Sequence, residues 1–110
     1  MTTPLPNTLL QGTLELLILK TLSWGPRHGY AIARWVEETT SDALQIQEGS
    51  LYPALYRMRQ RRWLTVAWGE PELGRRIKLY SLTAEGREQL QLQAQQWHRC
   101  VVSMAKVLQA

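Results

Sequence analysis

Apolar side chains recur with helical spacing in the first half of the chain. Between residues 9 and 23 they form so wide a stripe that we expect a helix buried on most of its sides. Gly25 and Pro26 follow, and such a pair is typical of a helix end and a turn. A second helix is predicted over residues 28–38, because its apolar positions again share one face: Ala31, Ile32, Trp35 and Val36.

A third helix, predicted over residues 48–62, has two different faces. Leu51, Leu55 and Met58 are spaced by four and three residues, as expected for side chains that face a core. Pro53 lies in the first turns, where a missing N–H costs a helix little. The other side chains are available to solvent or to a ligand: Ser50, Tyr52, Pro53, Tyr56, Arg57, Arg59 and Gln60.

The hydrophobic period changes to two after the third helix. Alternating β-branched and aromatic residues predict strands over residues 63–68 and 77–82. The segment between them is rich in Gly and Pro, so we expect the two strands to form a hairpin. Thr83 is the predicted N-cap of a helix that runs from residue 84 to the terminus, since no proline interrupts it.

The last helix carries a regular apolar seam. Spacings of 4, 3, 4, 3 and 4 residues are typical of a coiled-coil core. We expect the seam to pair with the same helix of a second copy, because the preceding helices already supply a core of their own. The alternative is that it packs on its own domain. The predicted interface residues are Leu90, Ala94, Trp97, Val101, Met104 and Leu108.

The order of these elements predicts a mainly α fold with a small β-hairpin. Three helices, a hairpin and a long helix are typical of a winged helix-turn-helix followed by a C-terminal dimerisation helix. We expect a flexible N-terminal arm (1–8), a DNA-binding domain (9–83) and the dimerisation helix (84–110). In such a fold the third helix enters the major groove, and the hairpin contacts the backbone or the minor groove.

Positive charge is concentrated in the third helix and the hairpin. Residues 50–80 hold seven Arg and Lys against two Glu, whereas the net charge of the whole chain is only +4. A local basic segment is typical of a polyanion site, although a solvated cationic face has the same composition. Arg57 and Arg59 are placed for phosphates or a guanine edge. The predicted wing adds three cations for phosphates: Arg75, Arg76 and Lys78.

Aromatic and hydroxyl side chains complete the predicted DNA face. Ser50 and Tyr52 can donate hydrogen bonds to phosphates or base edges. Tyr52, Pro53 and Tyr56 offer apolar contacts to thymine methyl groups. For Tyr30 two interpretations stay open, packing against the third helix and a phosphate contact through its hydroxyl. We therefore expect double-stranded DNA as the partner.

Residues 9–90 resemble the PadR family of bacterial transcriptional regulators. The matching stretches are LLQGTLELLILKTL (9–22), HGYAIA (28–33), EGSLYPALYRMRQRRWL (48–64), AWGE (67–70) and RRIKLYSLTAEGREQL (75–90). The resemblance implies a winged helix domain, a homodimer built through the C-terminal helix, and repression that a small molecule usually relieves. The single short C-terminal helix resembles the compact subgroup of the family.

The resemblance also implies where DNA is contacted. The family's DNA-contacting helix would start at Gly49 and include Tyr52 and Pro53. Two segments depart from the family pattern: residues 60–62 are more basic than usual, and residues 70–74 replace a polar, Asn-containing wing. The family's basic wing would fall on Arg75, Arg76 and Lys78.

The same hydrophobic patterns predict where each tryptophan lies. Trp97 lies in the middle of the predicted seam, where two facing indoles would sandwich a small planar aromatic effector. The alternative is that Trp97 only fills the interface, since aromatic burial there needs no ligand. The remaining tryptophans are expected in the core (Trp24, Trp35 and Trp63) or beside the wing (Trp68).

Other function classes have weaker support. His98 and Cys100 would diverge by about 200° on a helix, so a metal-responsive regulator would need ligands from a second subunit. Ser50 lies in EGSLY, which lacks the second glycine of a nucleophile elbow, so we expect no enzyme. No cofactor and no metal are predicted. A winged-helix module for protein contacts is the other alternative.

The compartment is predicted from features of the whole chain. No apolar run reaches the roughly 18 residues that span a bilayer, and no cleavage site follows residues 14–19 as in a signal peptide. Cys100 is the single cysteine, which fits a reducing compartment. We expect a cytoplasmic protein without a membrane partner.

Overall fold

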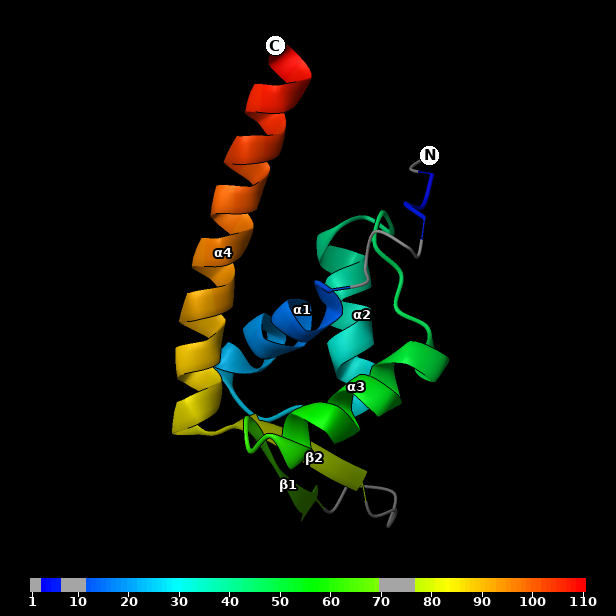
Figure 1. Cartoon of the computed structure of the whole chain (residues 1–110). Helices are drawn as coiled ribbons and strands as arrows, with labels where there is room; N and C mark the ends of the chain where they lie inside the picture. The colour runs from blue at the N-terminus through cyan, green and yellow to red at the C-terminus, as the bar shows by residue number, and fades with distance from the viewer. Residues whose placement is uncertain (1–2, 7–11, 70–76) are drawn as a thin grey trace.

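The predicted order of elements is found in a computed structural model that describes residues 3–6, 12–69 and 77–110. The elements are α1 (Leu14–Thr21), the 3₁₀ helix η2 (Leu22–Trp24), α2 (Gly29–Thr39), α3 (Glu48–Gln60), β1 (Leu64–Gly69), β2 (Ile77–Leu82) and α4 (Ala84–Gln109). Helices α1, α2 and α3 lie together above the hairpin, and α4 rises away from them (Figure 1). The expected mainly α fold with a small hairpin is confirmed.

The first helix begins later than the sequence predicts. Gly12 has φ +83°, a left-handed conformation that glycine adopts readily and that interrupts a right-handed helix. Thr13 is therefore the N-cap and α1 starts at the next residue, while residues 9–11 lie outside the described part of the chain. Gly25, with φ +144°, ends η2 as predicted.

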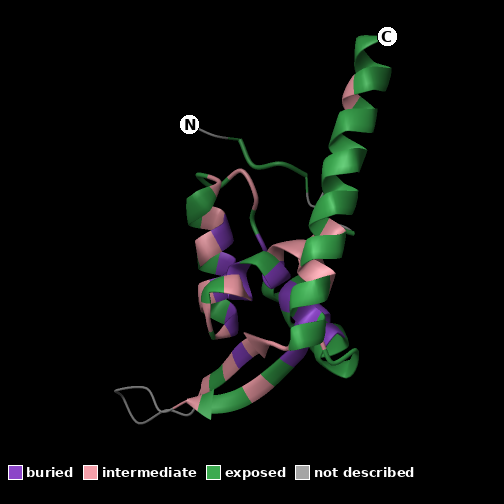
Figure 2. Cartoon of the chain, turned by 90° about the vertical axis from the view of Figure 1, so that its left-hand side faces the viewer, coloured by how far each residue is buried: buried purple, intermediate pink, exposed green. Residues whose placement is uncertain are grey.

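Helix α3 packs its predicted aliphatic face into the core. Leu51, Leu55 and Met58 are at most 1% exposed, and Ala54 is buried between them. Buried residues gather where α3 meets α1, α2 and the hairpin (Figure 2). The other members of this core include Ile18, Leu19, Leu22, Ile32, Val36, Leu64 and Tyr80. The packing holds α3 from one side and leaves its opposite side exposed.

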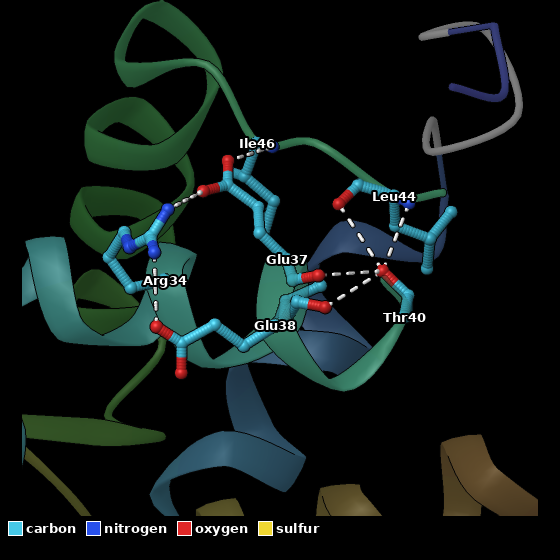
Figure 3. Close-up of polar contacts among 7 residues, drawn as sticks. Arg34, Glu37, Glu38, Thr40, Leu44 and Ile46 are labelled. Atoms are coloured by element: carbon cyan, nitrogen blue, oxygen red, sulfur yellow. Dashed lines mark hydrogen bonds and ion pairs between the residues drawn. The ribbon is translucent and has the colours of Figure 1, made fainter. Parts of the chain in front are cut away.

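Side chains of α2 and of its C-cap, Thr40, hold the turn that leads into α3 (Figure 3). One carboxylate oxygen of Glu37 accepts a hydrogen bond from the N–H of Ile46 (3.3 Å), and the other lies 3.5 Å from Arg34. The Thr40 hydroxyl accepts a hydrogen bond from the N–H of Leu44 (3.1 Å). These bonds satisfy backbone donors of the turn, and they fix the direction in which α3 starts.

The N-terminal arm, predicted over residues 1–8, is described at residues 3–6. There the N–H of Leu5 donates a hydrogen bond to the carbonyl oxygen of Ala43 (2.8 Å). This contact joins the arm to the turn between α2 and α3.

The hairpin is joined to the helical body by an isolated antiparallel β-bridge between Tyr80 and Arg27. Strands β1 and β2 pair antiparallel, with Trp68 opposite Lys78. The N–H of Tyr80 donates to the carbonyl oxygen of Arg27 (2.8 Å) and its carbonyl accepts from the N–H of Arg27 (3.1 Å). Because Arg27 lies just before α2, this pairing anchors the hairpin beside the helices. Residues 70–76, at the predicted turn, lie outside the described residues.

Thr83 caps α4 as predicted and also joins it to the start of the hairpin. Its hydroxyl accepts a hydrogen bond from the N–H of Gly86 (2.9 Å) and donates to the carbonyl oxygen of Arg62 (2.7 Å). The N–H of Thr83 donates to the carbonyl oxygen of Trp63 (3.0 Å). Gly86 is buried so closely on this segment that an added Cβ would overlap that same carbonyl oxygen. The start of α4 is thereby fixed against the domain.

Most of α4 extends beyond the helical body. The helix has 26 residues, and its projection gives the molecule extents of 57 × 35 × 22 Å. Gly86, near its lower end, is buried, and most of the helix above is exposed (Figure 2). No helix within residues 3–6, 12–69 and 77–110 combines the length and the apolar character needed to cross a bilayer.

Candidate nucleic-acid interface

The exposed side of α3 carries the predicted base-contacting residues. At about 100° per residue, Gly49, Pro53 and Tyr56 lie opposite the buried face, and Tyr56 is 64% exposed. Ser50 lies on the flank toward α1, where it shares a cleft with residues of that helix. Tyr52, 45% exposed, lies on the other flank, against the start of α2. The predicted helix face is therefore accessible, with two chemically different flanks.

The flank toward α1 contains a three-residue ion cluster. The Arg57 Nε lies 3.5 Å from one carboxylate oxygen of Glu15, and an Arg61 nitrogen lies 3.0 Å from the other. Arg57 is thus still half-exposed, but part of its charge is compensated. Sequence reasoning missed Glu15, because Glu15 and Arg61 are 46 positions apart and only the packing of α1 on α3 brings them together.

The flank toward the hairpin contains two tyrosines. Tyr80 of β2 is 7% exposed and lies near Tyr52 and Arg59. Burial raises the pKa of the Tyr80 phenol, Tyr52 raises it further, and Arg59 lowers it. Because the ordinary pKa of this group is already 10.0, its hydroxyl stays protonated near neutral pH. Arg59 itself is exposed at the edge of this flank.

Tyr30 lies on the surface of α2. Its side chain is 62% exposed, which favours the phosphate contact over packing against the third helix. The ring lies parallel to that of His28, with the centroids 6.3 Å apart and an interplanar angle of 5°. His28 is the N-cap of α2 and accepts a hydrogen bond from the N–H of Ala31 through Nδ1 (3.2 Å). The Tyr30 hydroxyl is accessible to a ligand.

The wing is described in its two strands. Lys78 is exposed, and its ammonium lies 5.8 Å from the centroid of the Trp68 ring opposite it. This places one predicted phosphate contact on the hairpin. Arg75 and Arg76, the other two, lie outside the described residues.

One tryptophan prediction is wrong. Trp24 is 59% exposed, because it ends the 3₁₀ helix η2 at the surface instead of facing the core. Its ring contacts that of Trp35 (centroids 5.1 Å apart), and the Lys20 ammonium lies 4.6 Å from its centroid. Trp35 and Trp63 are partly buried against the core, in line with the prediction for them.

The predicted seam of α4 divides into two parts. Leu90 packs against the core of its own domain. The other five positions share its side of the helix but lie on the projecting part and are exposed: Ala94, Trp97, Val101, Met104 and Leu108. Trp97, 49% exposed, is accessible both to a second helix and to a planar ligand. An apolar face of this length on a projecting helix is available for association.

The side chains that could ligate a metal ion are scattered over the described part of the chain. There, no group of three or more His, Cys, Asp or Glu side chains lies close enough together to hold a metal ion. His98 and Cys100 are both exposed on α4. A metal-responsive regulator would need these two side chains together with ligands from a second subunit.

Helices α2 and α3 form a helix-turn-helix in which α3 is exposed and the hairpin lies beside it. This arrangement defines a winged-helix DNA-binding protein. Residues 18–92 match the model of the PadR-like family of transcriptional regulators. The protein therefore belongs to the PadR-like family and is a DNA-binding transcriptional regulator, not an enzyme.

Solved structures agree with this assignment. A PadR family transcription regulator from Clostridium difficile is 32% identical, with a TM-score of 0.76 over 88% of this chain and 99% of that one. A PadR-like regulator from Bacillus cereus is 29% identical, with a TM-score of 0.79 over 94% and 98%. A transcriptional regulator from Clostridium thermocellum shares the fold, with a TM-score of 0.83 at 24% identity over 90% and 96%.

Proposed function

We propose that this regulator is a homodimeric repressor that binds an inverted-repeat operator, with one α3 in the major groove of each half-site. The observation that carries the proposal is the exposed face of α3, where Pro53 and Tyr56 point away from a helix fixed by its buried side. A rigid helix with such a face fits the width of the major groove. The α2–α3 turn, held by Glu37, supports a fixed docking angle.

Within this interface the proposed roles differ between residues. Tyr52, Pro53 and Tyr56 contact base edges and thymine methyl groups, and Ser50 donates to a phosphate or base edge. The helix backbone approaches the duplex at Gly49, which has no side chain to hold it away. The proposed phosphate contacts are Tyr30, Arg57, Arg59, Arg75, Arg76 and Lys78.

The proposed dimer uses the exposed face of α4. Trp97, Val101 and Met104 are 49%, 44% and 56% exposed, although they are large apolar residues at coiled-coil spacing. A second copy is the occupant proposed, because a two-fold interface needs one self-complementary patch, and this stripe repeats along a single helix. Two α3 helices would then meet half-sites about one helical turn, roughly 10 bp, or a multiple of it apart.

The division of roles predicts two distinct mutant phenotypes. Tyr52→Ala should change which sequences are preferred and weaken binding to the best operator about tenfold, because it removes a base contact. Lys78→Ala should weaken binding to all sequences, and it should flatten the slope of log K against log salt by about 0.9, because one phosphate contact is lost. Fluorescence anisotropy titrations at several salt concentrations measure both.

Lys106→Ala is the matched control for charge removal, since Lys106 lies at the far end of α4. It should leave the salt slope unchanged. Wild-type binding by both Tyr52→Ala and Lys78→Ala would contradict the proposed DNA face.

The ion cluster around Glu15 predicts a variant that binds DNA more tightly. Glu15→Gln should release the charge of Arg57 and Arg61 and steepen the salt slope by up to about one, with affinity raised roughly threefold at low salt. Glu38→Gln is the control, because Glu38 pairs with Arg34 (3.1 Å) on α2. Equal effects of both variants would show that this flank does not face the duplex.

A further inference from the structure

Gly29 lies at the first position of α2, within the HGY element, and its backbone does not require glycine. Its φ lies outside the left-handed region, and it is buried. Alanine is a better helix former than glycine, by about 1 kcal/mol in a helix interior, so helix propensity gives no reason for a glycine at this position. The reason for glycine must therefore lie in what the position touches.

The Tyr52 ring occupies the space where a side chain at position 29 would be. A Cβ on Gly29 would lie 2.9 Å from Tyr52 Cε1, 3.0 Å from its hydroxyl oxygen and 3.2 Å from Cζ. Carbon atoms in contact prefer separations of about 3.5–4.0 Å, so the ring and an alanine methyl cannot both keep these positions. The bare backbone of Gly29 thus forms a seat for one edge of the ring.

This seat determines how Tyr52 is presented. The side chain is 45% exposed, so part of it packs on α2 while the rest stays accessible at the flank of α3. The buried Tyr80 lies near the same ring. Tyr52 thus packs against the start of α2 and is less exposed than Tyr56, which is 64% exposed.

We propose that Gly29 is a specificity-determining position, because it seats the Tyr52 ring and so sets the place at which that side chain meets the bases. The inference rests on the proposed role of Tyr52 in DNA contact. Gly29 itself touches no DNA and acts through Tyr52 as a positioning residue. No charge changes on substitution, so the salt dependence of binding stays that of the wild type.

The test is a double-mutant cycle with Gly29→Ala and Tyr52→Ala, using operators selected from random DNA by the wild-type protein. Gly29→Ala should bind the wild-type operator about tenfold more weakly and select a different consensus, with an unchanged salt slope. In the Tyr52→Ala background, Gly29→Ala should cause no further loss. An unchanged consensus, or an equal loss in both backgrounds, would overturn the proposal.

Thermal unfolding keeps the test decisive if Gly29→Ala folds poorly. If the double variant folds and binds as Tyr52→Ala does, the clash with the ring is the cause and the seat is supported. If the double variant is as unstable as Gly29→Ala, the seat is refuted. If Tyr52→Ala alone kept wild-type specificity, the proposed role of Tyr52 in DNA contact would be refuted. Comparing the thermal stabilities of the wild type, the two single variants and the double variant would still show whether the Tyr52 ring clashes with a side chain at position 29.

Discussion

Gly86→Ala is expected to destabilise the protein by about 3 kcal/mol, although alanine is the better helix former. The added Cβ would overlap the carbonyl oxygen of Trp63, which is backbone and already accepts the N–H of Thr83. Neither the backbone at Trp63 nor the backbone at position 86 can move without breaking the cap that joins α4 to the hairpin. Overpacking against rigid backbone therefore outweighs the gain in helix propensity.

Urea denaturation measures this effect as a lower transition midpoint at an unchanged slope. Gly49→Ala is the matched control, because Gly49 also lies in the first turn of a helix but a Cβ there meets nothing within 4 Å. It should leave stability equal or raise it slightly. A stable Gly86→Ala protein would mean that the start of α4 can shift relative to the domain.

Val101→Glu is expected to convert the protein into a monomer and to weaken operator binding by about 10²- to 10³-fold, because linkage of two half-sites multiplies their affinities. The substitution would place one carboxylate from each subunit in an apolar seam, where unpaired charges are costly. Sedimentation velocity gives the oligomeric state, and anisotropy with a full and a half operator gives the affinity loss.

Val102→Glu provides a closely matched control. Val101 and Val102 are 44% and 41% exposed, and they are adjacent on α4. About 100° of helix separates their directions, so only Val101 lies on the predicted seam. Val102→Glu should stay dimeric. Disruption by both variants, or by neither, would contradict dimerisation through this face.

Local patterns predicted most of the fold because each depends on neighbouring residues. The Leu51, Leu55 and Met58 stripe gave the buried face of α3, and Thr83 marked the start of α4. The first helix was predicted too long because apolar spacing does not report the left-handed φ of Gly12. Trp24 was misplaced because hydrophobicity does not reveal that a 3₁₀ turn directs it to the surface.

The features of the candidate site that sequence reasoning missed all depend on tertiary contacts. Glu15 meets Arg57 and Arg61 only because α1 packs on α3. The ring that approaches Gly29 most closely is that of Tyr52, which comes from another helix. The exposed face of α3 could be predicted from the types of its side chains. The residues that contact its flanks could be found only from the three-dimensional structure.

A dimer that presents two α3 helices to DNA is tested most directly by selection of bound fragments followed by hydroxyl-radical footprinting. We expect enrichment of an inverted repeat, with two symmetric protected regions whose centres lie about 10 bp or a multiple of it apart. A lone asymmetric site, or no enrichment of any sequence at low salt, would contradict it.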